Sequence, residues 1–332
     1  VTRWARALSG SDMLAAPRAD SAPGGVRLCS SSEPCAEAME RLARIDGVEG
    51  IRRCAPVLYP QPGESRFESV DELCEWADRE GMSLGEAAWA RESDGLGLPA
   101  EDLKAEMLRR WAVMVDSIEK GLDDEEIHMP LTAPTASTVL RRERNGGLPL
   151  GGMLTRVAAR ALAVMHVCNS KGIVCAAPTG GSAGVLPAVL WTLATERGAS
   201  EESIVRGLFA AGGVGAGIAA RATFAAETAG CQVEIGAAGA MAAAAVVEIA
   251  GGSASQSAAA AAIALQNTMG SVCDPVGGGC EIPCHTRNAV AAANAFLCAD
   301  LAVGGASNVI PLDETIDASF AVGKALPTEL RC

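Results

Sequence analysis

Aromatic side chains are scarce in this 332-residue sequence, at 3% of all residues. A β-sheet core usually relies on Tyr, Phe and β-branched residues. Hydrophobic residues nevertheless make up 49% of the chain, so the core must be built from Ala, Val, Leu, Ile and Met. This composition favours helices that pack closely. It also excludes a chain that is disordered throughout, because enough apolar surface is present to bury.

Basic residues are also few: the formal net charge is −13 and only four lysines are present. This excludes nucleic acid or an anionic membrane surface as the main partner. The first residues, Val1–Gly10, lack the apolar stretch of a signal peptide. Two uncharged stretches rich in Gly and Ala, Gly207–Ala220 and Ile235–Val247, are shorter than a membrane-spanning helix requires. We therefore expect a cytoplasmic protein without a transmembrane segment.

The twelve cysteines include no C-x2-C pair of the kind that structural zinc sites usually contain. Secreted disulfide scaffolds are short and have thin cores. A long chain with a large apolar fraction is instead typical of reduced cysteines in the cytoplasm. Some of these cysteines then need another role.

The sequence predicts two regions, residues 1–62 and 63–332. In the first, a strand at Val26–Ser31, a helix at Pro34–Ile45 and a strand at Ile51–Leu58 are followed by a linker. The return into the last strand, "ARIDGVEGIRRC", resembles the closing half of an ACT-type regulatory domain. This resemblance implies a small α/β segment before the main domain.

The second region is predicted to be an all-α domain with its core in residues 146–331, where Gly and Ala dominate and charged residues thin out. Ser69, with Glu72 three residues later, predicts a helix start, and Ser200 and Ser255 predict two others. The predicted helices span Glu101–Gly121, Gly151–Cys168, Val185–Arg197, Ser200–Ala211, Gly236–Ala250, Ser255–Met269 and Asn288–Leu301.

A glycine-rich turn lies within "CAAPTGGSAGVLPAVL" at residues 175–190. Its residues Thr179, Gly180, Gly181 and Ser182 lead into a helix start, where backbone N–H groups and hydroxyls bind a carboxylate or phosphate well. The alternative is a tight turn where two helices cross. The pattern predicts a candidate substrate-binding site.

Three cysteines border irregular, glycine-rich segments: Cys231 in "TAGCQVEIG", and Cys273 and Cys284 on either side of the loop Asp274–Pro283. Iron–sulfur clusters usually take four thiolates. Three thiolates would leave one iron open for Lewis-acid chemistry. The alternative, cysteine as a small buried hydrophobe, fits Cys168, Cys175 and Cys298 better, because they lie on apolar stretches.

Lys171 precedes the glycine-rich turn, so a pyridoxal-phosphate lysine is a minor alternative. The α/β architecture that such enzymes usually need is not predicted. Lys171, His166 and His285 lie in the motif region, but the sequence singles out none of them as a catalytic base.

Long motifs, among them "CAAPTGGSAGVLPAVL", "ETAGCQVEIGAAGAMAAAAVVEIAGG", "SVCDPVGGGCEIPCHTRN", "NVIPLDETIDA" and "LPTELR", resemble the alpha part of the iron–sulfur-dependent bacterial L-serine dehydratases. The resemblance implies an all-α lyase that converts L-serine to pyruvate and ammonia. It implies a [4Fe-4S] cluster on Cys231, Cys273 and Cys284. Cys280 stands where that family usually has an aliphatic residue, and is not expected to be a ligand.

The resemblance also implies a beta part, as a second subunit or domain, or a homo-oligomer. Nothing in residues 1–68 resembles that beta part. A related L-cysteine desulfidase and a non-catalytic cluster-binding half-enzyme remain alternatives. Cys332, the last residue given, is expected either to dock its thiolate on the open iron in a resting form or to have no role.

Overall fold

The computed structural model describes residues 18–22, 25–29, 36–46, 48, 51, 69–123 and 127–331. The chain divides into two compact units, Val1–Pro60 and Gln61–Cys332. The part of the chain that the structure describes is mainly helical, as the composition predicts.

The first unit contains an antiparallel hairpin followed by a helix. Strand β1 (Arg18–Ala22) pairs with β2 (Gly25–Cys29), and α2 (Ala36–Ala43) follows. The sequence does not predict β1, because this segment has no β-branched or aromatic residue and pairs through its backbone. The likeness to half of an ACT-type domain is not supported. The last strand predicted for it, Ile51–Leu58, lies outside the described residues apart from Ile51.

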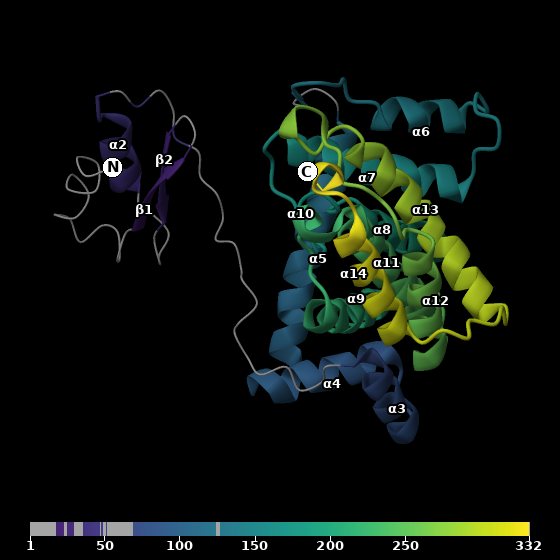
Figure 1. Ribbon diagram of the computed structural model, residues 1–332. Coiled ribbons are helices and arrows are strands. Elements are labelled where there is room, and N and C mark those ends of the chain that lie inside the picture. The colour runs from purple at the N-terminus through teal and green to yellow at the C-terminus, as the bar shows by residue number, and fades with distance from the viewer. Residues whose placement is uncertain are drawn as a thin grey trace. The chain divides into compact units, whose positions relative to one another are not determined.

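The second unit is a bundle of α-helices joined by turns and by longer loops, such as those between α7 and α8 and between α12 and α13 (Figure 1). Two short 3-10 helices lie in connections between α-helices. These are η2 (Cys231–Val233), between α10 and α11, and η3 (Val276–Gly278), between α12 and α13. A third, η4 (Thr328–Leu330), lies near the C-terminus. The α-helices are α3 (Val70–Glu80), α4 (Leu84–Leu96), α5 (Ala100–Leu122), α6 (Ala136–Arg144), α7 (Met153–Asn169), α8 (Val185–Arg197), α9 (Glu201–Arg221), α10 (Ala226–Ala229), α11 (Ile235–Ile249), α12 (Ala254–Gln266), α13 (Cys284–Val303) and α14 (Leu312–Ala325).

Helix α11 is the centre of this bundle. It packs against α8, α9, α12 and α13 (Figure 1), and every residue from Ile235 to Glu248 is buried. Its sequence, IGAAGAMAAAAVVEI, has small side chains on all faces, as expected of a helix buried all round. The small residues bring the neighbouring helices close and position the segments at both ends of α11.

Side-chain caps fix several helix starts. The Ser69 hydroxyl accepts the Glu72 N–H at 3.0 Å, so the predicted start of α3 is confirmed. The predicted start at Ser200 is also confirmed, because its hydroxyl accepts the Ser203 N–H. The predicted start at Ser255 is wrong. Ser253 is the cap of α12, since it forms a reciprocal capping box with Gln256.

Two helices, α9 and the segment Cys231–Ile249, are long and apolar enough to cross a membrane. Most of the apolar 18-residue stretch in each is buried inside the fold: 67% in α9 and 89% in Cys231–Ile249. Length and hydropathy are therefore weak evidence for a membrane span here, because core helices pass the same test.

Gly121 marks the closest approach between α5 and α7. A Cβ atom at this position would lie 1.9 Å from the carbonyl oxygen of Ala163. Helices that meet backbone to backbone cannot admit even a methyl group without moving apart. The contact holds α7 in place, and α7 ends beside the candidate site described below.

We therefore expect Gly121→Ala to lower the free energy of unfolding by about 2 kcal/mol, the cost of overpacking a rigid core. The matched control is Gly212→Ala in α9, where no atom lies within 4 Å of the added Cβ. That change should raise stability by about 0.5 kcal/mol through helix propensity. Chemical denaturation measures both, and equal effects would contradict the proposed close approach.

Candidate functional site

Three buried cysteines from separate segments come together at one end of α11. Cys231 begins η2, Cys273 lies in the loop after α12, and Cys284 begins α13; they are 0%, 6% and 3% exposed. The thiols of Cys231 and Cys273 share a hydrogen bond, and a charge on Cys231 acts on Cys284. Burial raises the pKa of Cys231, and the pKa of Cys284 is also raised, first by its hydrogen bond with Cys280.

Arg287, one turn into α13, connects these segments. Its Nη1 donates to the Cys231 Sγ at 3.4 Å and to the Val272 carbonyl at 3.0 Å, and forms an ion pair with Asp274 at 2.8 Å. A guanidinium beside a buried sulfur stabilises the thiolate, which is the form that binds metal. Arg287 is not among the site residues predicted from the sequence.

The chain near the C-terminus also lies against this site. The Cys273 N–H donates to the Leu330 carbonyl at 2.8 Å, and Cys273 and Arg331 form a parallel bridge. Cys332 lies outside the described residues, so the expectation that its thiol docks on the site stays a prediction.

The glycine-rich turn lies next to Cys284. The hydroxyls of Thr179 and Ser182 hydrogen-bond each other at 3.0 Å, and each accepts the backbone N–H of the other residue. Among the described residues, no acceptor within the chain is found for the N–H groups of Gly180 and Gly181. Two adjacent donors of this kind suit a carboxylate.

Asn288 of α13 ties this turn to the cysteine segment. Its Nδ2 donates to the carbonyls of Gly181 and Cys284, both at 2.8 Å, and its Oδ1 accepts the Gly184 N–H at 3.0 Å. The side chain is fully buried. These bonds fix the turn relative to the first turn of α13, and a single sequence gives no signal for this role.

Glu234 is the carboxylate at the centre of the site. It lies between η2 and α11, is 9% exposed, and accepts a short hydrogen bond from the Thr179 hydroxyl. Burial raises its pKa. A Cβ on Gly181 would lie 2.6 Å from its Oε1, so the turn passes directly over the carboxylate. Glu234 is not among the predicted site residues, although it is the one charged residue in "CQVEIGAAGAM".

The three residues considered as a base differ in their surroundings. His285 is 7% exposed; it pairs through Nε2 with Asn169 at 2.8 Å and is also hydrogen-bonded to the Met165 backbone. His166 is buried, with its ring centroid 5.3 Å from that of His285. Lys171 is exposed, in the turn after α7. His285 is thus occupied by structural bonds.

Glu281 anchors a further segment to the site. Its buried carboxylate accepts the Thr132 hydroxyl and N–H, both at 2.8 Å, and the Leu131 N–H at 3.2 Å. The loop between Cys273 and Cys284 is therefore held against the segment that precedes α6. Glu281 is a second functional candidate that the sequence analysis missed.

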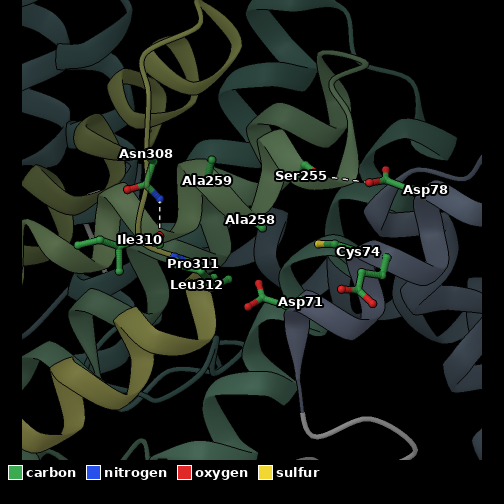
Figure 2. Close-up of a pocket in the computed structure, with 11 residues that line it drawn as sticks. Asp71, Cys74, Asp78, Ser255, Ala258, Ala259, Asn308, Ile310, Pro311 and Leu312 are labelled. Carbon is green, nitrogen blue, oxygen red and sulfur yellow. Dashed lines mark hydrogen bonds between the residues drawn. The ribbon is translucent and has the colours of Figure 1, made fainter.

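A separate cavity of about 250 Å³ lies between α3, α12 and the segment before α14 (Figure 2). The acidic residues Asp71, Glu75 and Asp78 of α3 line it. Ala258, Ala259 and Leu312 are among its apolar lining (Figure 2). None of the predicted site residues lines it. The candidate site is therefore defined by the converging side chains and not by this cavity.

The cysteine set does not have the arrangement of a site for a single metal ion. Among the described residues, no group of three or more His, Cys, Asp or Glu side chains is placed to hold a single ion. Ligands of a cluster bind different irons and lie farther apart than ligands of one ion. Three buried thiols from rigid segments, with a guanidinium on one of them, fit such a cluster chemically.

Gly181→Ala tests the contact between the turn and Glu234. Because the added methyl group would clash with Oε1, we expect the carboxylate to be displaced and kcat to fall at least about 10-fold. Gly180→Ala is the comparison, since its Cβ would meet only the Cys168 Sγ at 4.0 Å. A turnover loss in Gly181→Ala no greater than in Gly180→Ala would contradict the contact.

Comparisons with known proteins assign the chain to a family. The family model "Serine dehydratase alpha chain" matches residues 72–332. The chain is 38% identical over 265 residues to the probable L-serine dehydratase, alpha chain, of Bacillus subtilis (strain 168), covering 80% of this chain and 88% of that one. It is 33% identical to the L-serine dehydratase, alpha chain, of Peptoniphilus asaccharolyticus (80% and 91%). It is 35% identical to L-serine dehydratase TdcG of Escherichia coli (strain K12) (80% and 60%). The chain therefore belongs to the serine dehydratase alpha chain family, a family of carbon–oxygen lyases.

Proposed function

We propose that this chain is the alpha part of an L-serine dehydratase, which converts L-serine to pyruvate and ammonia. One observation carries the proposal: three buried cysteines converge beside a turn with two available N–H donors and a buried carboxylate. Membership in the family, whose relatives are named L-serine dehydratases, supports the substrate and the reaction.

Cys231, Cys273 and Cys284 would hold a [4Fe-4S] cluster. With three thiolate ligands, the bound cluster supplies a Lewis acid at the iron that has no protein ligand. The protein's contribution is rigidity. Arg287 holds Cys231, the backbone at Leu330 holds Cys273, and Cys284 is fixed by the start of α13.

The glycine-rich turn orients the substrate. The N–H groups of Gly180 and Gly181 donate to the serine carboxylate, and the hydroxyls of Thr179 and Ser182 shape the turn. Holding the carboxylate in one place restricts rotation and points the α-hydrogen in a defined direction. Asn288 preserves this orientation relative to Cys284.

Glu234 is the residue we assign to accept the α-proton. It is a buried carboxylate that contacts the same turn, through the Thr179 hydroxyl. A desolvated carboxylate is a stronger base than one in water. The hydrogen bond from Thr179 fixes which oxygen faces the turn.

A beta part completes the enzyme in this proposal, either as a separate subunit or through a homo-oligomer. Two relatives are named alpha chains, and this chain spans only 60% of the Escherichia coli TdcG protein. The thiol-based site also calls for a reducing compartment, so we assign the enzyme to the cytoplasm.

Parallel anaerobic assays with L-serine and L-cysteine test the proposed reaction, using the chain together with its beta part. We expect pyruvate from L-serine, at a kcat/KM well above that for L-cysteine, and little sulfide from L-cysteine. Preferred release of sulfide from L-cysteine would support a desulfidase instead. No turnover of either substrate by a protein with a full cluster would support a non-catalytic half-enzyme.

A further inference from the structure

Cys280 is a thiol that the proposed reaction leaves unused. It lies in the loop that leads into Cys284, and it is partly exposed, whereas Cys284 is buried. Cys280 packs against the buried cluster that contains Cys284, four residues further along the chain, and the two thiols are close enough to interact. Asn169 Nδ2 donates to the Cys280 carbonyl at 2.9 Å, which holds this part of the loop against the end of α7.

We propose that Cys280 and Cys284 form a reversible disulfide in the metal-free protein when it meets a peroxide. The accessible Cys280 thiolate attacks the peroxide, which gives a sulfenic acid on Cys280 and releases hydroxide. The Cys284 sulfur then attacks the Cys280 sulfur, an S–S bond forms, and water leaves. Two thiols lose two electrons and the peroxide gains them. A dithiol reductant restores both thiols by exchange.

The geometry favours this pair over the other thiols nearby. Cys168 lies close enough for a charge on Cys280 to act on it, but its Sγ donates to the Gly180 carbonyl at 3.4 Å. Cys231 and Cys273 contact each other, but both are buried. Cys280 combines partial exposure with packing against the buried cluster that contains the Cys284 thiol.

The disulfide would protect the two thiols from irreversible oxidation and would also prevent cluster binding. A cysteine without a partner oxidises further, to a sulfinic acid that ordinary reductants do not reverse. The disulfide stops that step but occupies Cys284. This consequence, although not the disulfide itself, rests on the proposed function, in which Cys284 is a cluster ligand.

Peptide mapping tests the disulfide without any activity assay. The metal-free, fully reduced protein is treated with hydrogen peroxide, blocked with N-ethylmaleimide and digested with trypsin. No Lys or Arg occurs between Ala222 and Arg287, so a Cys280–Cys284 bond stays within one peptide. Cleavage after Glu281 then cuts the chain between the two cysteines, so the two fragments stay together only if the disulfide is present. We expect this linked pair to be the major oxidised product.

Two variants sharpen the result. Cys280→Val should abolish the link and leave the buried Cys284 as a free thiol, whereas Cys168→Ala should leave the link unchanged. A main product joining Cys168 to Cys280 or Cys231 to Cys273, or free Cys280 and Cys284 after peroxide treatment, would overturn the proposal.

Cluster reconstitution with ferrous iron and sulfide separates this proposal from the proposed function. Peroxide-treated wild-type protein should take up iron only after dithiol reduction, whereas peroxide-treated Cys280→Val should take up iron without it, because its buried Cys284 stays a free thiol. If even the untreated reduced protein takes up no cluster, the proposed function fails, while the peptide map still decides whether the disulfide forms. Full iron uptake by the disulfide-linked protein without reductant would overturn the proposal that the disulfide prevents cluster binding.

Discussion

Cys231→Ser, Cys273→Ser and Cys284→Ser should each reduce the iron content of the anaerobically purified protein from about four atoms per chain to near zero. A serine hydroxyl is a far weaker iron ligand than a thiolate. The three cysteines come from different segments and are all buried. Iron, sulfide and the visible absorption band measure the effect, and dehydration activity should be lost with them.

Cys298→Ala is the matched control for this series. Cys298 lies further along α13, the helix that Cys284 begins, and is 1% exposed. Burial raises its pKa to about 11, so it stays a neutral thiol. The control should keep its full iron content. A full cluster in any of the three serine variants would refute the ligand assignment for that residue.

Glu234→Gln should lower kcat for L-serine at least about 100-fold, the usual contribution of a positioned base. The amide has the same shape and can still accept the Thr179 hydrogen bond, but it cannot take up a proton. Exchange of the L-serine α-hydrogen with deuterated solvent gives a second measurement, and we expect it to stop as well. The iron content should be unchanged, since Glu234 is not a proposed ligand.

Glu248→Gln controls for the loss of a buried carboxylate. Glu248 lies at the other end of α11 and accepts the Ser83 hydroxyl at 2.6 Å and the Gly85 N–H at 2.9 Å. Burial raises the pKa of Glu248, as it does for Glu234. Its replacement should cost about 1–3 kcal/mol of stability and leave kcat nearly unchanged. If Glu234→Gln raised only KM and left α-hydrogen exchange intact, Glu234 would be a positioning residue and not the base.

The helical part of the fold follows well from the sequence, because helix periodicity and caps are local. The prediction for α8 is confirmed to the residue, and those for α5 and α11 to within a residue or so. α9 runs on to Arg221, beyond the predicted Ala211, because Gly212 and Gly213 are tolerated in a helix packed against α4 and α11. α13 begins at Cys284, four residues before the predicted start at Asn288. Pro283, directly before Cys284, is a usual mark of a helix start and could have indicated this.

The candidate site is harder to predict, because its contacts join segments far apart in the sequence. The glycine-rich turn and the cysteine segments could be picked out by composition. Asn288 and Glu281 could not be picked out in this way. Asn288 hydrogen-bonds three backbone groups, and Glu281 binds a segment about 150 residues away in the sequence. Glu234 did carry a signal, a lone charge in an apolar stretch, which is costly to bury without a purpose.

Mössbauer spectroscopy of the iron-labelled protein, with and without L-serine, tests the central claim most directly. An iron that has no protein thiolate is the one that substrate can reach. We therefore predict that adding L-serine under anaerobic conditions changes the spectrum of one iron of the four and leaves the other three unchanged. An identical spectrum in saturating L-serine, from protein that turns L-serine over, would contradict the claim that the cluster presents an open iron to the substrate.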